Sequence, residues 1–275
     1  MACPRTDGGG DSSGSGLTGA LAAGHNGLVE NANRGQYIDA AKKELDAAVA
    51  SKKITQQDAN IRLEVVKAAL SGKLSIERDE AADARDPSLW ETDPATGELD
   101  RFVLRPTPSA SAALDSAFAA LPGHRIGYWC RGAAQLDILR GQEQAAGKAG
   151  IPKFDTFAMG KSPASLFPEY NNLADGKHMG NFTECERNAN GIDPKTLLPG
   201  DQTWVKDSLG SGTEAGSNKF YIGGGLYAEP YSNSDSSVSI FDYQGYLDFV
   251  HAETGHPDIS TLSIIRVGRP IVPSY

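Results

Sequence analysis

The sequence is poor in cysteine and has no long apolar run. Its 275 residues include three cysteines, Cys3, Cys130 and Cys185, so at least one thiol is unpaired and a disulfide scaffold is excluded. The cysteine spacing matches no zinc-binding pattern, and we expect neither a metal nor another cofactor. No apolar stretch approaches the roughly 20 residues that span a bilayer, and the N-terminus lacks the pattern of a secretory signal. We therefore expect no membrane span.

Basic charge is also scarce. The chain has 26 Lys and Arg residues against 35 Asp and Glu residues, which gives a formal net charge of -9, and no Lys/Arg-rich run offsets it locally. This balance repels a phosphate backbone, so nucleic acid is not an expected partner. A hydrophobic content of 39% is enough for an ordinary core, whereas 31 glycines predict extensive loops.

Shifts in composition predict four segments. Residues 1–24 are small, polar and rich in glycine, which is typical of a flexible lead-in. Residues 25–85 follow a helical pattern and form a predicted helical entry or connecting module. Prolines and a glycine turn mark a linker over 86–100. Residues 101–275 form the predicted catalytic domain.

The helical module shows apolar residues at helical spacing. Ile38, Ala41 and Leu45 fall on one face of a first predicted helix. Thr55 stands where the N-cap of a second helix belongs, and Val65 lies on the apolar face of that helix. Charges of alternating sign on both helices favour a solvated face over a binding stripe.

The C-terminal part mixes helices and strands. We expect a helix over about 109–120, another after Cys130 and a third late in the chain. Three short runs rich in β-branched and aromatic residues follow the second of these helices. These runs are Thr203–Val205, Lys219–Ile222 and Leu262–Val267. Helices first and strands later predict an α+β fold with an antiparallel sheet.

Cys130 stands at the start of the second of these helices, directly before Arg131. Unpaired amides and the positive end of the helix dipole stabilise a thiolate, so the pKa of Cys130 would fall below the roughly 8.5 of a free thiol. The alternative is a core cysteine packed under Trp129. Cys185 lies between two glutamates, whose negative charges would raise its pKa, and is a poor nucleophile.

A nucleophilic thiol needs an acid/base partner within hydrogen-bond reach. The five histidines of the chain lie at positions typical of surface residues. Glu214, in a Gly/Ser loop before the run Lys219–Ile222, and Glu229, just after the glycine turn that follows this run, are better placed. Each of the two glutamates can equally be a solvated loop residue.

Several ordered motifs resemble those of the spore-coat type of bacterial protein-glutamine γ-glutamyltransferase, a transglutaminase with a papain-like core. The resemblance covers about 101–275. The motifs are Arg101–Pro106, Tyr128–Cys130, Leu197–Asp201 with Trp204–Lys206, and Gly216–Asn218 followed by Ile222–Tyr227. It implies a papain-like domain with an antiparallel sheet and a nucleophile helix.

By this resemblance Cys130 attacks the carboxamide of a protein glutamine, releases ammonia and forms a thioester that a lysine amine or water resolves. The chain departs from the family at three positions. Trp129 and Ser217 replace glutamates of the family, and Pro230 replaces a histidine. The acid/base partner of Cys130 therefore stays open between Glu214 and Glu229.

A second resemblance concerns Val29–Asn31, which is similar to the V-E-N-N boundary before the C-terminal toxin regions of contact-dependent growth-inhibition exoproteins and departs from it at Ala32. It implies a toxin module that is secreted or delivered into a target cell as part of a larger exoprotein, with a cognate immunity protein as partner. The alternative is a chance match, which leaves a cytoplasmic location.

We therefore expect cysteine-dependent acyl transfer on the glutamine side chains of a protein substrate, by transamidation to lysine or by deamidation. A cysteine peptidase or amidase with the same core is the nearest enzymatic alternative, because one fold hosts several chemistries. A non-catalytic binding module is the alternative from a different class, and the missing glutamates favour it.

Overall fold

The computed structural model describes about half of the chain. The described residues are 27–29, 32–74, 88, 90–92, 102–104, 110–119, 130–148, 183–188, 190–207, 218–232, 236–254 and 262–270. The predicted lead-in over 1–24 and most of the predicted linker over 86–100 lie outside them.

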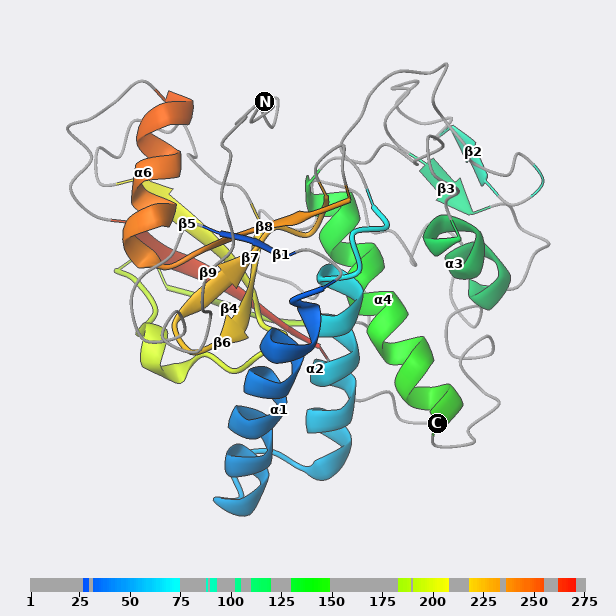
Figure 1. The fold of residues 1–275 in the computed structure, drawn as a ribbon, viewed down its shortest axis with the longest axis horizontal. Helices are drawn as coiled ribbons and strands as arrows, with labels where there is room; N and C mark the ends of the chain where they lie inside the picture. Colours follow the sequence, from blue (N-terminus) through cyan, green and yellow to red (C-terminus); the bar gives the residue numbers. More distant parts are fainter. Residues whose placement is uncertain are drawn as a thin grey trace.

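Helices and a large antiparallel sheet make up the described structure (Figure 1). The helices are α1 (Arg34–Ala50), α2 (Gln56–Ala69), α3 (Ala110–Phe118), α4 (Cys130–Lys148), the 3-10 helix η5 (Pro194–Thr196) and α6 (Tyr243–Thr254). The strands are β1 (Gly27–Val29), β2 (Trp90–Thr92), β3 (Phe102–Leu104), β4 (Thr183–Arg187), β5 (Gln202–Asp207), β6 (Lys219–Gly223), β7 (Leu226–Ala228), β8 (Val238–Phe241) and β9 (Leu262–Pro270). The prediction of an α+β fold with an antiparallel sheet is confirmed.

Seven of these strands form one sheet, in the order β1-β8-β7-β6-β5-β9-β4, and every neighbouring pair is antiparallel. Strands β2 and β3 pair separately. The predicted runs at 203–205, 219–222 and 262–267 correspond to β5, β6 and β9.

Local signals explain where α2 begins. The Thr55 hydroxyl accepts a hydrogen bond from the backbone N–H of Asp58 at 3.1 Å, and the Asp58 carboxylate accepts one from the backbone N–H of Thr55 at 3.1 Å. This reciprocal capping box satisfies two donors that a helix start leaves unpaired. The predicted N-cap at Thr55 is confirmed.

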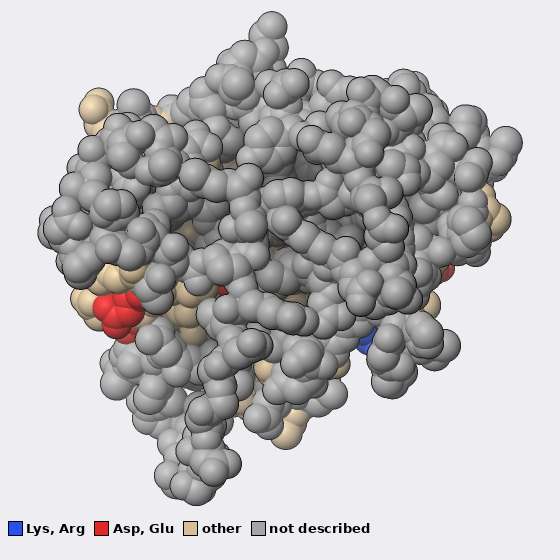
Figure 2. All heavy atoms as spheres, turned by 90° about the horizontal axis from the view of Figure 1, so that it is seen from above, with Lys and Arg blue, Asp and Glu red and all other residues tan. Residues whose placement is uncertain are grey.

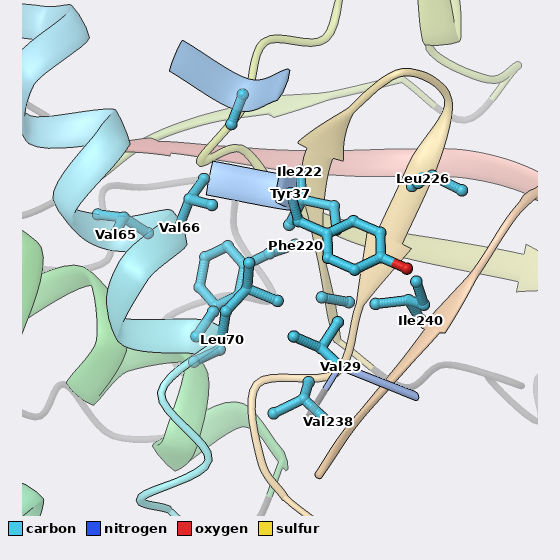
Figure 3. Packing of buried hydrophobic residues seen from close by; sticks show 14 of the residues in the cluster. Val29, Tyr37, Val65, Val66, Leu70, Phe220, Ile222, Leu226, Val238 and Ile240 are labelled. Atoms are coloured by element: carbon cyan, nitrogen blue, oxygen red, sulfur yellow. The ribbon is translucent and has the colours of Figure 1, made fainter. Parts of the chain in front are cut away.

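The apolar faces of α1, α2 and α4 meet one face of the sheet in a shared core of mainly aliphatic side chains (Figure 3). The core consists of Val29, Tyr37, Ala41, Ile61, Val65, Val66, Ala69, Leu70, Ala134, Ile138, Phe220, Ile222, Leu226, Ala228, Val238 and Ile240. The other face of the sheet packs against α6 through a second cluster, to which Tyr227, Phe241 and Tyr246 belong.

Residues on both sides of the predicted linker contribute to this packing. Val29 of β1 pairs with Val238 of β8, so the segment 25–85 contributes a strand to the sheet. The apolar faces of α1 and α2 are buried against β6 and α4 rather than against each other alone. The predicted module 25–85 and the predicted domain 101–275 therefore share one core, because neither helix could bury its apolar face without the sheet.

Helices α2 and α4 lie side by side at very close range (Figure 1). A Cβ atom built on Gly141 of α4 would lie 2.4 Å from Cγ2 of Val65 and 2.6 Å from its backbone nitrogen. Only glycine leaves room for this approach of two backbones.

The prediction of a solvated charged face on these helices is wrong at two positions of α2. Arg62 is buried and forms an ion pair of 2.5 Å with the fully buried Asp201. Glu64, also buried, accepts from Lys67 at 2.8 Å and from Lys148 of α4 at 2.6 Å. These ion pairs connect α2 with Asp201, directly before β5, and with α4.

Within the described residues, no helix has the length and apolar character that a bilayer crossing requires. On the face seen in Figure 2, the described Lys and Arg residues form no continuous basic patch, and acidic atoms are the more visible ones.

Candidate functional site

The predicted nucleophile Cys130 is the first residue of α4, a helix of 19 residues. The prediction that a helix starts at this cysteine is confirmed, although its side chain and residues 121–129 lie outside the described part of the chain. The first N–H groups of such a helix have no intrahelical partner and favour negative charge. This position can stabilise a thiolate, or an oxyanion that forms beside it.

Cys185 occupies a different environment. It lies in β4, the terminal strand of the sheet, opposite Gly268 of β9. A strand position, unlike the start of a helix, has no helix dipole directed at the thiol.

The structure describes only one of the two predicted acidic partners, Glu229. Glu214 lies outside the described residues. Glu229 directly follows β7, is only 3% exposed, and forms an ion pair of 2.8 Å with Lys219 Nζ. The Tyr231 hydroxyl donates to the same Glu229 oxygen at 2.7 Å. Glu229 is therefore a buried carboxylate with two partners of its own, not a solvated loop residue.

Strand register places Glu229 on the sheet face that α4 does not cover. Phe220 of β6 is opposite Ala228 of β7, and both belong to the core shared with α1, α2 and α4. Because side chains alternate along a strand, their neighbours Lys219 and Glu229 point to the opposite face. The described structure thus brings Glu229 together with Lys219 and not with the helix that begins at Cys130.

Aromatic rings surround the buried ammonium group of Lys219. Lys219 Nζ lies 4.3 Å from the ring centre of Phe249, 5.0 Å from that of Phe241 and 5.4 Å from that of Tyr246. Cation–π attraction and the Glu229 carboxylate together compensate for the loss of water around this charge. Nearby, burial raises the pKa of Tyr221 to about 12.

The sequence analysis missed a pair of hydrogen-bonded amide side chains on the opposite face, which α1, α2 and α4 cover. One amide belongs to β5 and the other to the residue directly before β6. Gln202 of β5 donates from Nε2 to Oδ1 of Asn218 at 2.8 Å, and both residues are buried. Asn218 alternates in phase with the core residue Phe220, which fixes the face. The sequence signal for this pair is the motif Gly216–Asn218. It belongs to the ordered motifs of the family resemblance and does not by itself predict an interaction between amides.

The motif Leu197–Asp201 has a structural role in the described residues. Asp201 Oδ2 accepts from the backbone N–H of Leu198 at 2.9 Å, and Oδ1 binds Arg62. Gly200 adopts a φ of +90° with its Cα against the Arg62 backbone, where a Cβ would lie 2.9 Å from the Arg62 carbonyl oxygen. The motif therefore takes part in the contact between α2 and the segment before β5.

The described residues contain no group of three or more His, Cys, Asp and Glu side chains arranged to hold a metal ion. Comparisons of the chain with protein family models, with curated proteins and with solved structures found no match. The two resemblances therefore rest on the residues quoted for them alone.

Proposed function

We propose that this protein is a cysteine-dependent acyltransferase that acts on the glutamine carboxamides of a protein substrate, with Cys130 as the nucleophile. One observation carries the proposal: a helix of 19 residues starts at this cysteine. The packing of α4 supports it, because Ala134, one turn beyond Cys130, is fully buried in the core shared with α2 and the sheet. The start of a helix held in this way has a fixed position and a fixed dipole.

The reaction needs few groups. The Cys130 thiolate attacks the carboxamide carbon, and the carbonyl oxygen takes the negative charge, which the first amides of α4 can stabilise. Ammonia leaves with a proton from a general acid, and the C–N bond gives way to a thioester. A lysine amine then displaces the sulfur to form an isopeptide bond, or water displaces it to form glutamate.

The engagement of Glu229 favours Glu214 as the proton-transferring partner. Glu229 would have to leave Lys219 and Tyr231 in order to act, and Lys219 would then be an unpaired charge at 0% exposure. Glu214 precedes β6 in the sequence and has no assigned structural role. We therefore assign the acid/base role to Glu214.

The experiment compares Cys130→Ala with Cys185→Ala as the matched control. Transfer of a fluorescent primary amine to a glutamine-containing protein, and release of ammonia, are measured for both variants and for the original protein. We expect Cys130→Ala to lose about 10⁴-fold or more of the rate and Cys185→Ala to keep it. Equal activity of the three proteins rejects Cys130 as the nucleophile, and cleavage of the substrate backbone instead would favour a peptidase.

The same assay tests the partner. Glu214→Gln is expected to lower the rate by about 10²-fold or more, which is the usual effect of a lost acid/base group. Glu229→Gln is expected to lower the stability of the fold while the folded fraction keeps its rate. A kinetic defect confined to folded Glu229→Gln would return the role to Glu229, and no activity in any form of the protein would favour a non-catalytic binding module.

The similarity of Val29–Asn31 to a toxin boundary extends the proposal to a delivered bacterial toxin with an immunity partner. Val29 is fully buried and paired with Val238, so this end of the motif is part of the sheet. This placement supports a toxin region that includes β1, α1 and α2. Expression inside bacteria should then stop growth for the original protein and not for Cys130→Ala.

A further inference from the structure

Asp137 is a buried carboxyl group in the middle of α4. It has an exposed fraction of 0%, and within the described part of the chain neither of its side-chain oxygens has a hydrogen-bond partner. It lies one helical turn before Gly141, the residue that contacts Val65 of α2, and hence on the stripe of α4 that turns toward α2. Its neighbour along the chain, Ile138, belongs to the core.

The described charged side chains of the helices packed around Asp137 are engaged elsewhere. On α2, Arg62 pairs with Asp201, Lys67 pairs with Glu64, and Asp58 caps the helix through Thr55. On α4 and α3, Lys148 pairs with Glu64, and Arg140 pairs with Asp115 and Glu143. The side chain of Arg131 lies outside the described residues. None of these ion pairs or hydrogen bonds between described residues includes Asp137.

A charged carboxylate at such a position is very unfavourable, whereas a neutral carboxylic acid is tolerated. Burial accordingly raises the pKa of Asp137 well above its usual value. Burial also raises the pKa of Glu143, but Arg140 partly offsets that effect with its charge and a hydrogen bond. Of the two carboxyl groups, Asp137 has no compensating cation among the described side chains.

We propose that the contact between α2 and α4 is a pH-dependent latch, closed while Asp137 is protonated and loosened when Asp137 ionises. The carboxyl group is fully buried and lies one helical turn from the close approach of Gly141 to Val65 of α2. An ionised Asp137 gains solvation if α4 moves away from α2. A rise in pH therefore favours the opened form and acid favours the closed one.

The sign follows from proton binding. Between the ordinary pKa of an aspartate, about 4, and the raised value, the folded state holds a proton that the unfolded state has lost. Stability is thus fully present below about pH 4 and falls as the pH rises, by up to tenfold in the folding equilibrium constant per pH unit. If Cys130 is the nucleophile, as proposed above, the same transition would control the rigidity of its helix; the latch itself does not require that function.

The experiment uses Asp137→Asn, which keeps the shape of the side chain and cannot ionise, and Asp115→Asn as a control at a side chain that is 65% exposed. Urea unfolding and hydrogen exchange of α4 amides are measured for each protein at pH 5 and pH 8. Comparison of variants at one pH cancels the intrinsic pH dependence of exchange. Asp137→Leu provides a second non-ionising variant.

We divide the folding equilibrium constant of Asp137→Asn by that of the original protein, and expect this ratio to rise at least tenfold between pH 5 and pH 8. At pH 8 the α4 amides of the original protein should also exchange faster than those of Asp137→Asn. The ratio for Asp115→Asn should stay constant. A constant ratio for both Asp137 variants overturns the latch, whatever their absolute stability and whether or not the protein transfers acyl groups.

Discussion

The two faces of the large sheet are covered by different kinds of side chains. The face under α1, α2 and α4 is mainly aliphatic, with residues such as Val65, Leu70 and Ile222. The face under α6 is aromatic and encloses a complete ion pair, Lys219 with Glu229. On the helical side, the described buried ion pair joins Arg62 of α2 to Asp201, whereas the pair on the α6 face joins two neighbouring segments of the sheet.

The difference appears most clearly in two buried carboxyl groups. Glu229 has an ammonium group and a tyrosine hydroxyl as partners, which compensate for its burial. Among the described residues, Asp137 of α4 has neither kind of partner, and burial raises its pKa. The contact between α2 and α4 should therefore respond to changes of pH.

The largest expected effect comes from breaking the ion pair on the α6 face. Glu229→Leu leaves the Lys219 ammonium group unpaired at 0% exposure, and loss of one partner of a buried pair lowers the free energy of unfolding by about 3–5 kcal/mol. Urea denaturation followed by far-UV circular dichroism measures this loss. The tyrosine partner Tyr231 cannot replace the carboxylate charge.

A double variant isolates the pair from its packing. In Lys219→Met combined with Glu229→Leu no charge remains, and the aromatic rings of Phe241 and Phe249 can pack on the methionine. We expect the double variant to recover most of the stability that Glu229→Leu loses. A double variant as unstable as the single one would mean that the pair itself stabilises the fold.

The second effect concerns the helical layer. Gly141→Ala places a Cβ against the backbone and side chain of Val65 at distances that require α2 and α4 to separate, and such overpacking costs about 1–3 kcal/mol. Gly147→Ala is the control in the same helix, because a Cβ there meets nothing within 4 Å. It should stabilise α4 by about 0.5–1 kcal/mol through helix propensity. Thermal unfolding of both variants decides; equal shifts of the same sign would contradict the close contact.

The elements that the sequence predicted are those with a strong local signal. The apolar spacing of α1, the cap at Thr55 and the β-branched runs of β5, β6 and β9 all identify elements that the structure contains. By contrast, β1 has only three residues, and β4 consists mostly of polar and charged residues, so neither shows a strand pattern. Their place in the sheet depends on pairing with β8 and β9, which are distant in the sequence. Local sequence patterns do not reveal such pairings.

The site was predictable to a similar degree. The helix start at Cys130 follows from local sequence, but the engagement of Glu229 depends on hairpin register. The glycine turn Gly223–Gly225 offered a signal: strands folded back around it place Lys219 opposite Glu229. No comparable signal marked Asp137, because the described cations of α2 and α4 pair with other acids. Such pairing exists only in the assembled structure.

The smallest of the three effects tests whether the helical layer depends on the start of α2. Thr55→Ala removes the hydroxyl that accepts from Asp58 and should lower the free energy of unfolding by about 1 kcal/mol. Ser51→Ala, a few residues earlier, removes only a bond to the Ala48 carbonyl and should change stability by less than about 0.5 kcal/mol. If α2 is held chiefly by Arg62 and Gly141 rather than by its cap, the two variants will be indistinguishable by urea denaturation. A clear difference between them would mean that the local capping signal contributes to the helical layer beyond the tertiary contacts.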